Sequence, residues 1–118
     1  MLAGIHSVLI WTDDVNRLLP FYREVLGLQP EMESDGFVVF QASSGGQLAL
    51  GAHSEVHGRS RDPYRVMVDF EVDDCQEEYE RLSKGGVEFI RPPSKEDGAT
   101  IATFRDPDGN LLQLFEME

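Results

Sequence analysis

Asp69 is the residue whose type and position most directly suggest chemistry. It interrupts a stretch of alternating apolar residues, 65–72, that has the pattern of a β-strand. Removing a carboxylate from water is costly unless it gains a partner. That partner is either the water of an open cup or an arginine, for which Arg65, Arg91 and Arg105 are the candidates. The functional alternatives are recognition of a cationic or hydrogen-bond-donating ligand, or service as a general base with a raised pKa.

Histidine and cysteine offer little further chemistry. The spacing of His6, His53 and His57 matches no standard zinc motif, even with Glu55 added. His53 and His57 fall in a polar stretch and are expected to be exposed, whereas His6 begins a strand near the surface or against a helix. The single cysteine, Cys75, excludes an internal disulfide and a thiol cluster for zinc. Its helix-facing position predicts a small core residue.

Two amphipathic helices must position these side chains. In the first, apolar residues recur at helical spacing over residues 15–26, after Asp13 and Asp14 at capping positions. Pro20 removes an internal hydrogen-bond donor. The regular helix therefore begins later, near Asn16, or it is kinked.

The second helix follows Asp74, which forms a capping-box pattern with Glu77. Cys75, Tyr79 and Leu82 share one face of this helix, and the glycines at 85–86 end it. The remaining segments read as strands, at residues 5–11, 29–34, 37–42, 47–52, 65–72, 87–90, 99–105 and 111–116. The Ser-Ser-Gly-Gly turn at 43–46 and the turn at 106–110, which combines proline, glycine and residues that tolerate a left-handed conformation, predict two hairpins. The Asp-Pro-Asp-Gly run at 106–109 is therefore assigned to turn chemistry.

The order of elements is strand, helix and three strands, repeated once. Thr12-Asp13-Asp14 before the first helix corresponds to Val72-Asp73-Asp74 before the second. We therefore predict an α+β fold with two βαβββ modules forming a curved mixed sheet around a small-molecule pocket, with the helices on the outer face. Residues 1–118 form one domain, with modules at 1–52 and 65–118 and a linker at 53–64.

Strand alternation divides the side chains between the helices and the pocket. The helix-facing set is apolar and comprises Val8, Ile10, Leu48, Leu50, Val66, Val68, Phe70, Val72, Leu112 and Leu114. The pocket set is Ser7, Leu9, Trp11, Gln47, Ala49, Met67, Asp69, Gln113 and Phe115. Apolar walls with a few orienting polar groups are typical of small-molecule sites. Trp11 would offer a flat face to an aromatic or cationic ligand, or would pack at a strand end or in a dimer.

The net charge of the chain limits the classes of partner that it is expected to bind. Ten Lys and Arg against 22 Asp and Glu give a formal charge of −12, which disfavours nucleic acids and anionic membranes. The acidity favours solubility or attraction of a cationic ligand. No apolar run approaches the ~20 residues of a membrane-spanning helix. The N-terminus lacks the pattern of a signal peptide and there is one cysteine, so we expect a cytoplasmic location.

Three segments resemble the vicinal oxygen chelate superfamily, which includes glyoxalase I, extradiol dioxygenases and bleomycin-resistance proteins. They are TDDVNRLLPFYREVLGL (12–28), VDFEVDDCQEEYERLSKGGVEF (68–89) and FRDPDGNLLQLFE (104–116). The resemblance implies paired βαβββ modules and a homodimer.

Catalytic members of that superfamily hold a divalent metal on inward-facing His, Glu or Gln side chains. Counting from the acid at each helix start, the corresponding positions here are Ser7, Ala49, Met67 and Gln113. Alanine has no ligating atom, and a methionine thioether is a poor ligand for Mg, Mn, Fe or Zn. Gln113 remains a candidate ligand, and His6 becomes one if a bulge turns it inward.

We therefore predict a metal-independent protein that binds a small molecule and resembles bleomycin-resistance proteins, with no cofactor. Its ligand is expected to be cationic or a polar aromatic molecule. The first alternative is a divalent-metal-dependent lyase or dioxygenase resembling glyoxalase I, with metal on His6 and Gln113. The second is a metal-free isomerase or lyase in which Asp69 is the catalytic base.

Overall fold

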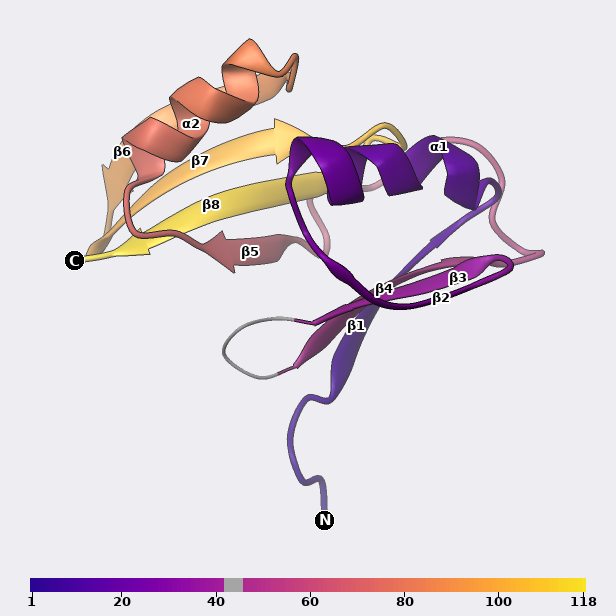
Figure 1. Ribbon diagram of the computed structural model, residues 1–118. Coiled ribbons are helices and arrows are strands. Elements are labelled where there is room, and N and C mark those ends of the chain that lie inside the picture. The colour runs from indigo at the N-terminus through magenta and orange to yellow at the C-terminus, as the bar shows by residue number, and fades with distance from the viewer. Residues whose placement is uncertain (42–45) are drawn as a thin grey trace. The chain divides into compact units, whose positions relative to one another are not determined.

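The computed structural model describes residues 1–41 and 46–118, which divide into two compact units, Met1–Gly58 and Arg59–Glu118. Most of the hairpin turn predicted at 43–46 lies outside the described residues. Each unit carries one sheet with helical structure packed against it (Figure 1). The order strand, helix, three strands is present in both units, so the α+β class and the βαβββ repeat are confirmed.

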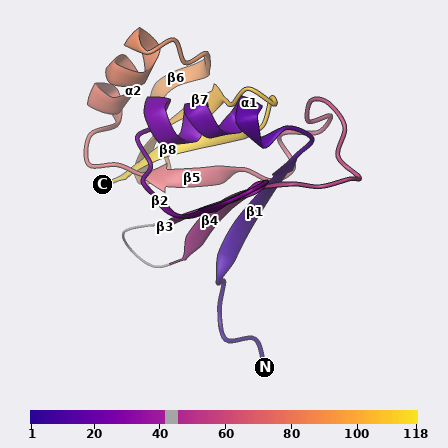
Figure 2. The same cartoon turned by 45° about the vertical axis from the view of Figure 1, so that its right-hand side comes forward.

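The first unit contains a mixed sheet of four strands within its described residues. The strands are β1 (Ser7–Thr12), β2 (Pro30–Ser34), β3 (Phe37–Gln41) and β4 (Gln47–Ala52). Their order is β1-β4-β3-β2, with β1 parallel to β4 and the other pairs antiparallel. The residues before β1 run on from this edge strand as an extended arm (Figure 2).

The helix of the first unit changes its hydrogen-bonding pattern at Pro20. The α-helix α1 (Val15–Pro20) begins directly after Asp14, whose carboxylate accepts a hydrogen bond from the backbone of Asn16 at 3.0 Å. The helix therefore starts one residue before the alternative start predicted near Asn16. A π-helical turn, η1 (Phe21–Val25), follows, and Leu26 donates its backbone N–H to the carbonyl of Phe21 at 2.9 Å. Proline has no backbone N–H, and the wider π-helical turn accommodates the hydrogen bond that is missing at Pro20.

Asp13 ties the end of the first unit back to this helix. Its carboxylate forms an ion pair with Arg17 and accepts the backbone N–H of Gly58 at 2.9 Å. The hydrogen bond from Gly58, followed by the bond from Arg17, lowers the pKa of Asp13. Asp14 therefore caps the helix, while Asp13 anchors the chain that leaves the unit.

The core of the first unit lies between the helix and the sheet. Leu18 and Tyr22 are fully buried on the helix, opposite Phe40 and Leu50 of the sheet. The rings of Tyr22 and Phe40 stack with centroids 6.5 Å apart. These residues occupy one face of the sheet, which leaves the face of Leu9 and Trp11 free of the helix.

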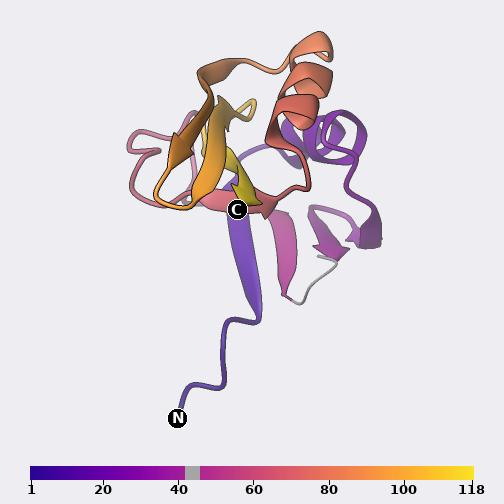
Figure 3. The same ribbon diagram turned by 90° about the vertical axis from the view of Figure 1, so that its left-hand side faces the viewer.

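The second unit repeats this plan. Its strands are β5 (Val68–Glu71), β6 (Phe89–Glu96), β7 (Ala99–Arg105) and β8 (Leu111–Met117), in the order β5-β8-β7-β6. The helix α2 (Cys75–Lys84) packs against β6, β7 and β8, along one side of the sheet (Figure 3). Asp74 caps it by accepting the N–H of Glu77 at 3.0 Å, as the capping-box pattern predicts.

Two strands of the second unit differ from their predicted extents. Val66 was expected to face the helices but is 76% exposed, because β5 pairs with β8 only from Val68 onward. The strand predicted at 87–90 instead runs from Phe89 to Glu96. The strand includes two consecutive prolines, Pro92 and Pro93, because β6 lies at the sheet edge, where an unpaired backbone position is tolerated.

The turn at 106–110 has a structural role. The Asp106 carboxylate accepts the backbone N–H groups of Asp108 and Asn110, at 2.8 and 2.9 Å, and the Asn110 side-chain amide at 2.8 Å. Arg59 donates to the carbonyl of Pro107 at 3.2 Å and lies against Gly109. The Asp106 carboxylate is thus engaged in hydrogen bonds within the turn, and the role of the turn is to connect β7 to β8.

Helices long and apolar enough to cross a bilayer do not occur within residues 1–41 and 46–118.

Candidate functional site

The register of the second sheet places two rows of side chains on opposite faces. Along one row the paired residues are Val68, Leu112, Phe104 and Phe89, and this apolar row faces the helix α2. Tyr79 of α2 packs on Phe89 with ring centroids 4.7 Å apart. The neighbouring row is Asp69, Gln113, Thr103 and Arg91, which faces away from α2. Each of the four strands therefore contributes one polar residue to a row on the face opposite the helix.

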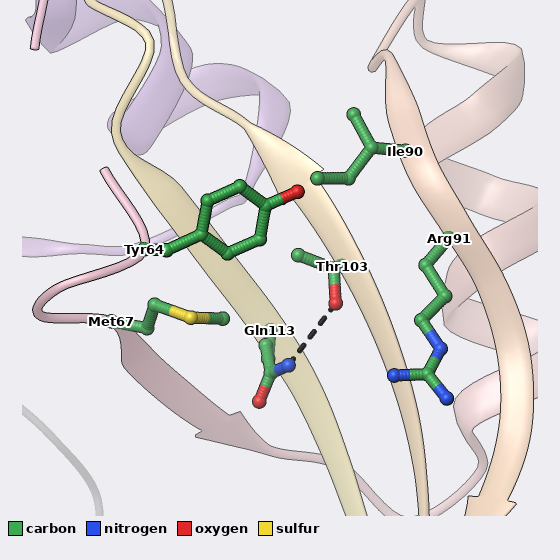
Figure 4. A pocket seen from close by; sticks show the side chains of 6 residues that line it. All are labelled: Tyr64, Met67, Ile90, Arg91, Thr103 and Gln113. Carbon is green, nitrogen blue, oxygen red and sulfur yellow. Dashed lines mark hydrogen bonds between the residues drawn. The ribbon is translucent and has the colours of Figure 1, made fainter. Parts of the chain in front are cut away.

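A pocket opens over this polar row. It has a volume of about 340 Å³ and is lined by Tyr64, Met67, Ile90, Arg91, Thr103 and Gln113 (Figure 4). Met67 and Ile90 supply apolar walls, and the Tyr64 ring stands at the mouth, largely exposed. Protein pockets that bind drug-sized molecules range from about 300 to 1,000 Å³, so this one suits a small ligand.

The floor of the pocket carries a fixed polar pair. Gln113 donates its side-chain N–H to the hydroxyl of Thr103 at 3.1 Å, and Thr103 is buried. The bond holds the Gln113 amide with its oxygen turned away from Thr103 (Figure 4). That oxygen is placed to accept a hydrogen bond from a bound molecule.

A bulge in β6 delivers two adjacent residues to the pocket. Phe89 pairs with Phe104, and Arg91 pairs with Thr103, so the partner strand advances one residue while β6 advances two. Such a bulge breaks the alternation of side chains. Ile90 and Arg91 consequently both line the pocket, which strict alternation forbids. Sequence reasoning missed both, together with Tyr64 and Thr103; only the Pro92-Pro93 pair hinted at irregular pairing.

Met67, Asp69, Gln113 and Phe115 share this face of the second sheet, as their alternation predicts. Met67 and Gln113 line the pocket, and Asp69 lies beside Gln113 on the neighbouring strand. Partial burial raises the pKa of Asp69. The three arginines considered as its partners pair elsewhere: Arg65 with Asp62, Arg91 with Glu96 and Arg105 with Glu88.

The five predicted pocket residues of the first unit share a face of their own sheet. Ser7, Leu9 and Trp11 alternate along β1, and Gln47 and Ala49 along β4. Ala49 is buried between its register partners Leu9 and Val39. Trp11 packs against Phe37 and His53, with ring centroids at 6.2 and 5.3 Å, and keeps 38% of its surface exposed.

The residues at the metal-ligand positions of the resemblance do not fit a hard divalent metal. Ala49 has no donor atom and Met67 offers a soft thioether, which leaves Gln113 and Ser7 as oxygen donors. His6 precedes β1 and is exposed. Within the described residues, no three His, Cys, Asp or Glu side chains are grouped closely enough to hold a metal ion.

Cys75 is fully buried at the start of α2, so its predicted core position is confirmed. Its backbone N–H donates to the Glu116 carboxylate at 2.7 Å. Burial, with the charges of Glu116 and Asp74, raises the pKa of the Cys75 thiol. The thiol is therefore an unreactive core group.

Residues 4–114 match the model of the Glyoxalase/Bleomycin resistance protein/Dioxygenase superfamily. An uncharacterized protein of Shewanella frigidimarina is 29% identical over 129 residues, covering 99% of this chain and 96% of that protein. A member of the same superfamily from Sphaerobacter thermophilus has a crystal structure that is 27% identical, with a TM-score of 0.76 and coverage of 98% of both chains. A glyoxalase/bleomycin resistance protein/dioxygenase from Nocardioides is 26% identical, with a TM-score of 0.76 and coverage of 99% of this chain and 85% of that one.

Proposed function

Because the chain belongs to the Glyoxalase/Bleomycin resistance protein/Dioxygenase superfamily, we propose that it binds a small polar aromatic molecule without a metal. The observation that carries this proposal is the pocket of the second unit, where apolar walls surround the hydrogen-bonded pair of Gln113 and Thr103. The walls favour a ring, and the fixed amide favours a ligand with a polar substituent.

The aromatic character of the ligand follows from the lining. Met67 brings a polarizable thioether, and Met sulfur makes favourable contacts with aromatic rings. Tyr64 presents an aromatic ring at the mouth of the pocket. The hydroxyl of Tyr64, the amide of Gln113 and the guanidinium of Arg91 then select for polar groups on the ring.

Independence from metal is supported by the donor atoms of the pocket. Its side chains bring one amide, two hydroxyls, a guanidinium and a thioether. Divalent metals bound through oxygen or nitrogen generally need carboxylate or imidazole ligands. The pocket is accordingly suited to recognition by hydrogen bonds.

A matched pair of glutamine variants tests this function. The probe is benzamide, a neutral polar aromatic molecule, titrated into protein kept in EDTA and followed by NMR chemical shifts. We expect shifts to concentrate on the pocket residues and Gln113→Leu to weaken binding by about tenfold, because a buried hydrogen bond is lost. The control is Gln76→Leu on the exposed face of α2, where binding should not change. Absence of benzamide binding, or binding that EDTA abolishes, would contradict the proposal.

A second candidate, a metal-free isomerase or lyase, is favoured by the raised pKa of Asp69 beside Gln113. A general base works best with a pKa near the operating pH. Acetophenone, whose methyl protons lie next to a carbonyl, provides the test in deuterated water. Deuterium uptake that depends on the protein and disappears in Asp69→Asn would support this candidate, and equal uptake by both proteins would remove it.

We further propose that the protein acts in the cytoplasm as a homodimer. The single cysteine supports a reducing compartment, and the family relationship supports the dimer. Sedimentation equilibrium of the purified chain tests the second point, since a monomer at high concentration would contradict it.

A further inference from the structure

The polar row under the pocket carries opposite charges at its two ends. Asp69 stands on β5 at one sheet edge and Arg91 on β6 at the other, with Gln113 and Thr103 between them. Three strand spacings of about 4.8 Å put roughly 14 Å between the outer backbones. Arg91 lines the pocket itself, whereas Asp69 does not. The pocket therefore has a cationic end at β6.

The Arg91 guanidinium is held by a partner that a ligand can replace. It forms an ion pair with Glu96 of the same strand, and the two side chains are 47% and 42% exposed. Ion pairs between exposed side chains contribute little, because water and salt screen both charges. A guanidinium has five N–H donors in a planar fork, so one carboxylate leaves donors available for a second acceptor.

We propose that Arg91 recognises an anionic group and that the ligand of this pocket is an aromatic carboxylate. The ligand carboxylate displaces Glu96 from Arg91, and its ring lies toward Met67 and Tyr64. Asp69 fixes this direction, because it repels a carboxylate placed at the opposite end of the row. The inference rests on the proposed function and adds to it the charge of the ligand and the residue, Arg91, that recognises this charge.

Three probes of nearly identical shape test the charge preference: benzoate, benzamide and benzamidine. Binding is measured by NMR titration near physiological ionic strength, where the Debye length is about 8 Å and the acidic surface of the protein is screened. We expect benzoate to bind about tenfold more tightly than benzamide, since charge-assisted hydrogen bonds to arginine are the stronger kind. Benzamidine should bind more weakly than benzamide, because its amidinium cation is repelled by the Arg91 guanidinium.

Matched variants identify the residue responsible. Arg91→Gln should weaken benzoate more than benzamide and so abolish the preference for benzoate, because the charge that distinguishes the two ligands is gone while benzamide loses only a hydrogen bond to a neutral group. Glu96→Gln should strengthen benzoate binding by about two- to fivefold, because the competing carboxylate is gone. The Arg105 and Glu88 pair on the same sheet lies outside the pocket and provides controls, Arg105→Gln and Glu88→Gln, which should change neither affinity.

The outcomes separate this inference from the function on which it rests. Benzamide binding without a preference for benzoate, or a preference that survives Arg91→Gln, overturns the role of Arg91 and leaves the proposed function standing. Preferential binding of benzamidine overturns the inference in favour of a cationic ligand. If none of the three probes binds, the proposed function and the inference fail together.

Discussion

The indole of Trp11 lies directly over Gly51. A Cβ atom added at residue 51 would stand 2.5 Å from Cζ3 of Trp11 and 2.8 Å from Cδ1 of Phe37. Gly51 is also the register partner of Trp11 on the neighbouring strand, so the indole folds across the sheet onto its own partner. The glycine is there because any side chain would occupy the space of the ring.

Gly51→Ala is therefore expected to destabilise the protein by about 1–3 kcal/mol, the usual cost of overpacking. The methyl group must displace an indole and a phenyl ring. Urea unfolding measures the loss of stability. Trp11 is the single tryptophan of the chain, so its emission maximum reports any movement of the ring.

Gly85→Ala is the matched control, because Gly85 has an ordinary φ of −78° at the exposed end of α2. We expect it to leave the tryptophan emission unchanged. Equal stability and equal emission of Gly51→Ala and the wild type would contradict the close packing of Trp11.

Asp69→Asn is expected to raise stability at neutral pH. Because the pKa of Asp69 is raised in the folded protein, the native state binds more protons than the unfolded state between the ordinary and the raised value. The free energy of unfolding therefore falls as pH rises through that window. The gain from Asn should be present near pH 7 and disappear as the pH falls below the ordinary aspartate pKa of about 3.9, where Asp69 becomes protonated in both states. Thermal unfolding at a series of pH values measures it.

Glu71→Gln controls for the general repulsion in a chain of charge −12, since Glu71 stands two residues along the same strand. The gain in Asp69→Asn should exceed the gain in Glu71→Gln. A variant Asp69→Asn less stable than the wild type at pH 7 would mean that the carboxylate has a favourable partner, and the direction of its pKa would be wrong.

The thiol of Cys75 is expected to react with disulfide reagents only when α2 opens. It is fully buried and its pKa is raised by burial and by the nearby carboxylates. Native protein should react with DTNB more than about a hundredfold more slowly than urea-unfolded chain, because local opening limits the reaction.

Glu116 provides the variants for this experiment, since it accepts the N–H of Cys75. Glu116→Leu leaves that donor without its acceptor and should cost about 1–2 kcal/mol and accelerate the reaction. Glu116→Gln keeps an acceptor and should change both less. Rapid reaction of the native wild type would contradict the burial of Cys75.

Addition of Zn, Ni, Mn, Fe(II) or Mg is expected to leave the melting temperature unchanged. A metal present at about 100 times its dissociation constant would stabilise the native state by about 2.7 kcal/mol, which raises the melting temperature by several degrees. Ser7, Ala49, Met67 and Gln113 do not supply the ligands for such binding. Stoichiometric metal in protein purified without chelator, lost in His6→Ala, would instead establish the metal-dependent alternative.

Local patterns in the sequence were sufficient for the fold class. The caps at Asp14 and Asp74, the apolar spacing of the two helices and the turn at 106–110 act over a few residues, so each can be read from its own segment. Alternation also placed Met67, Asp69 and Gln113 on one face of a strand pair, because side chains in a regular strand alternate strictly.

Only the tertiary structure decided which other residues complete the pocket. Ile90 and Arg91 both face it because β6 slips by one residue against β7, and a bulge depends on the pairing of two strands. The partners of Arg91 and Arg105 were likewise open in the sequence, where every nearby acid is a candidate. Register between strands is set by the packing of the whole sheet, so the charge of this pocket could not be read from any one segment.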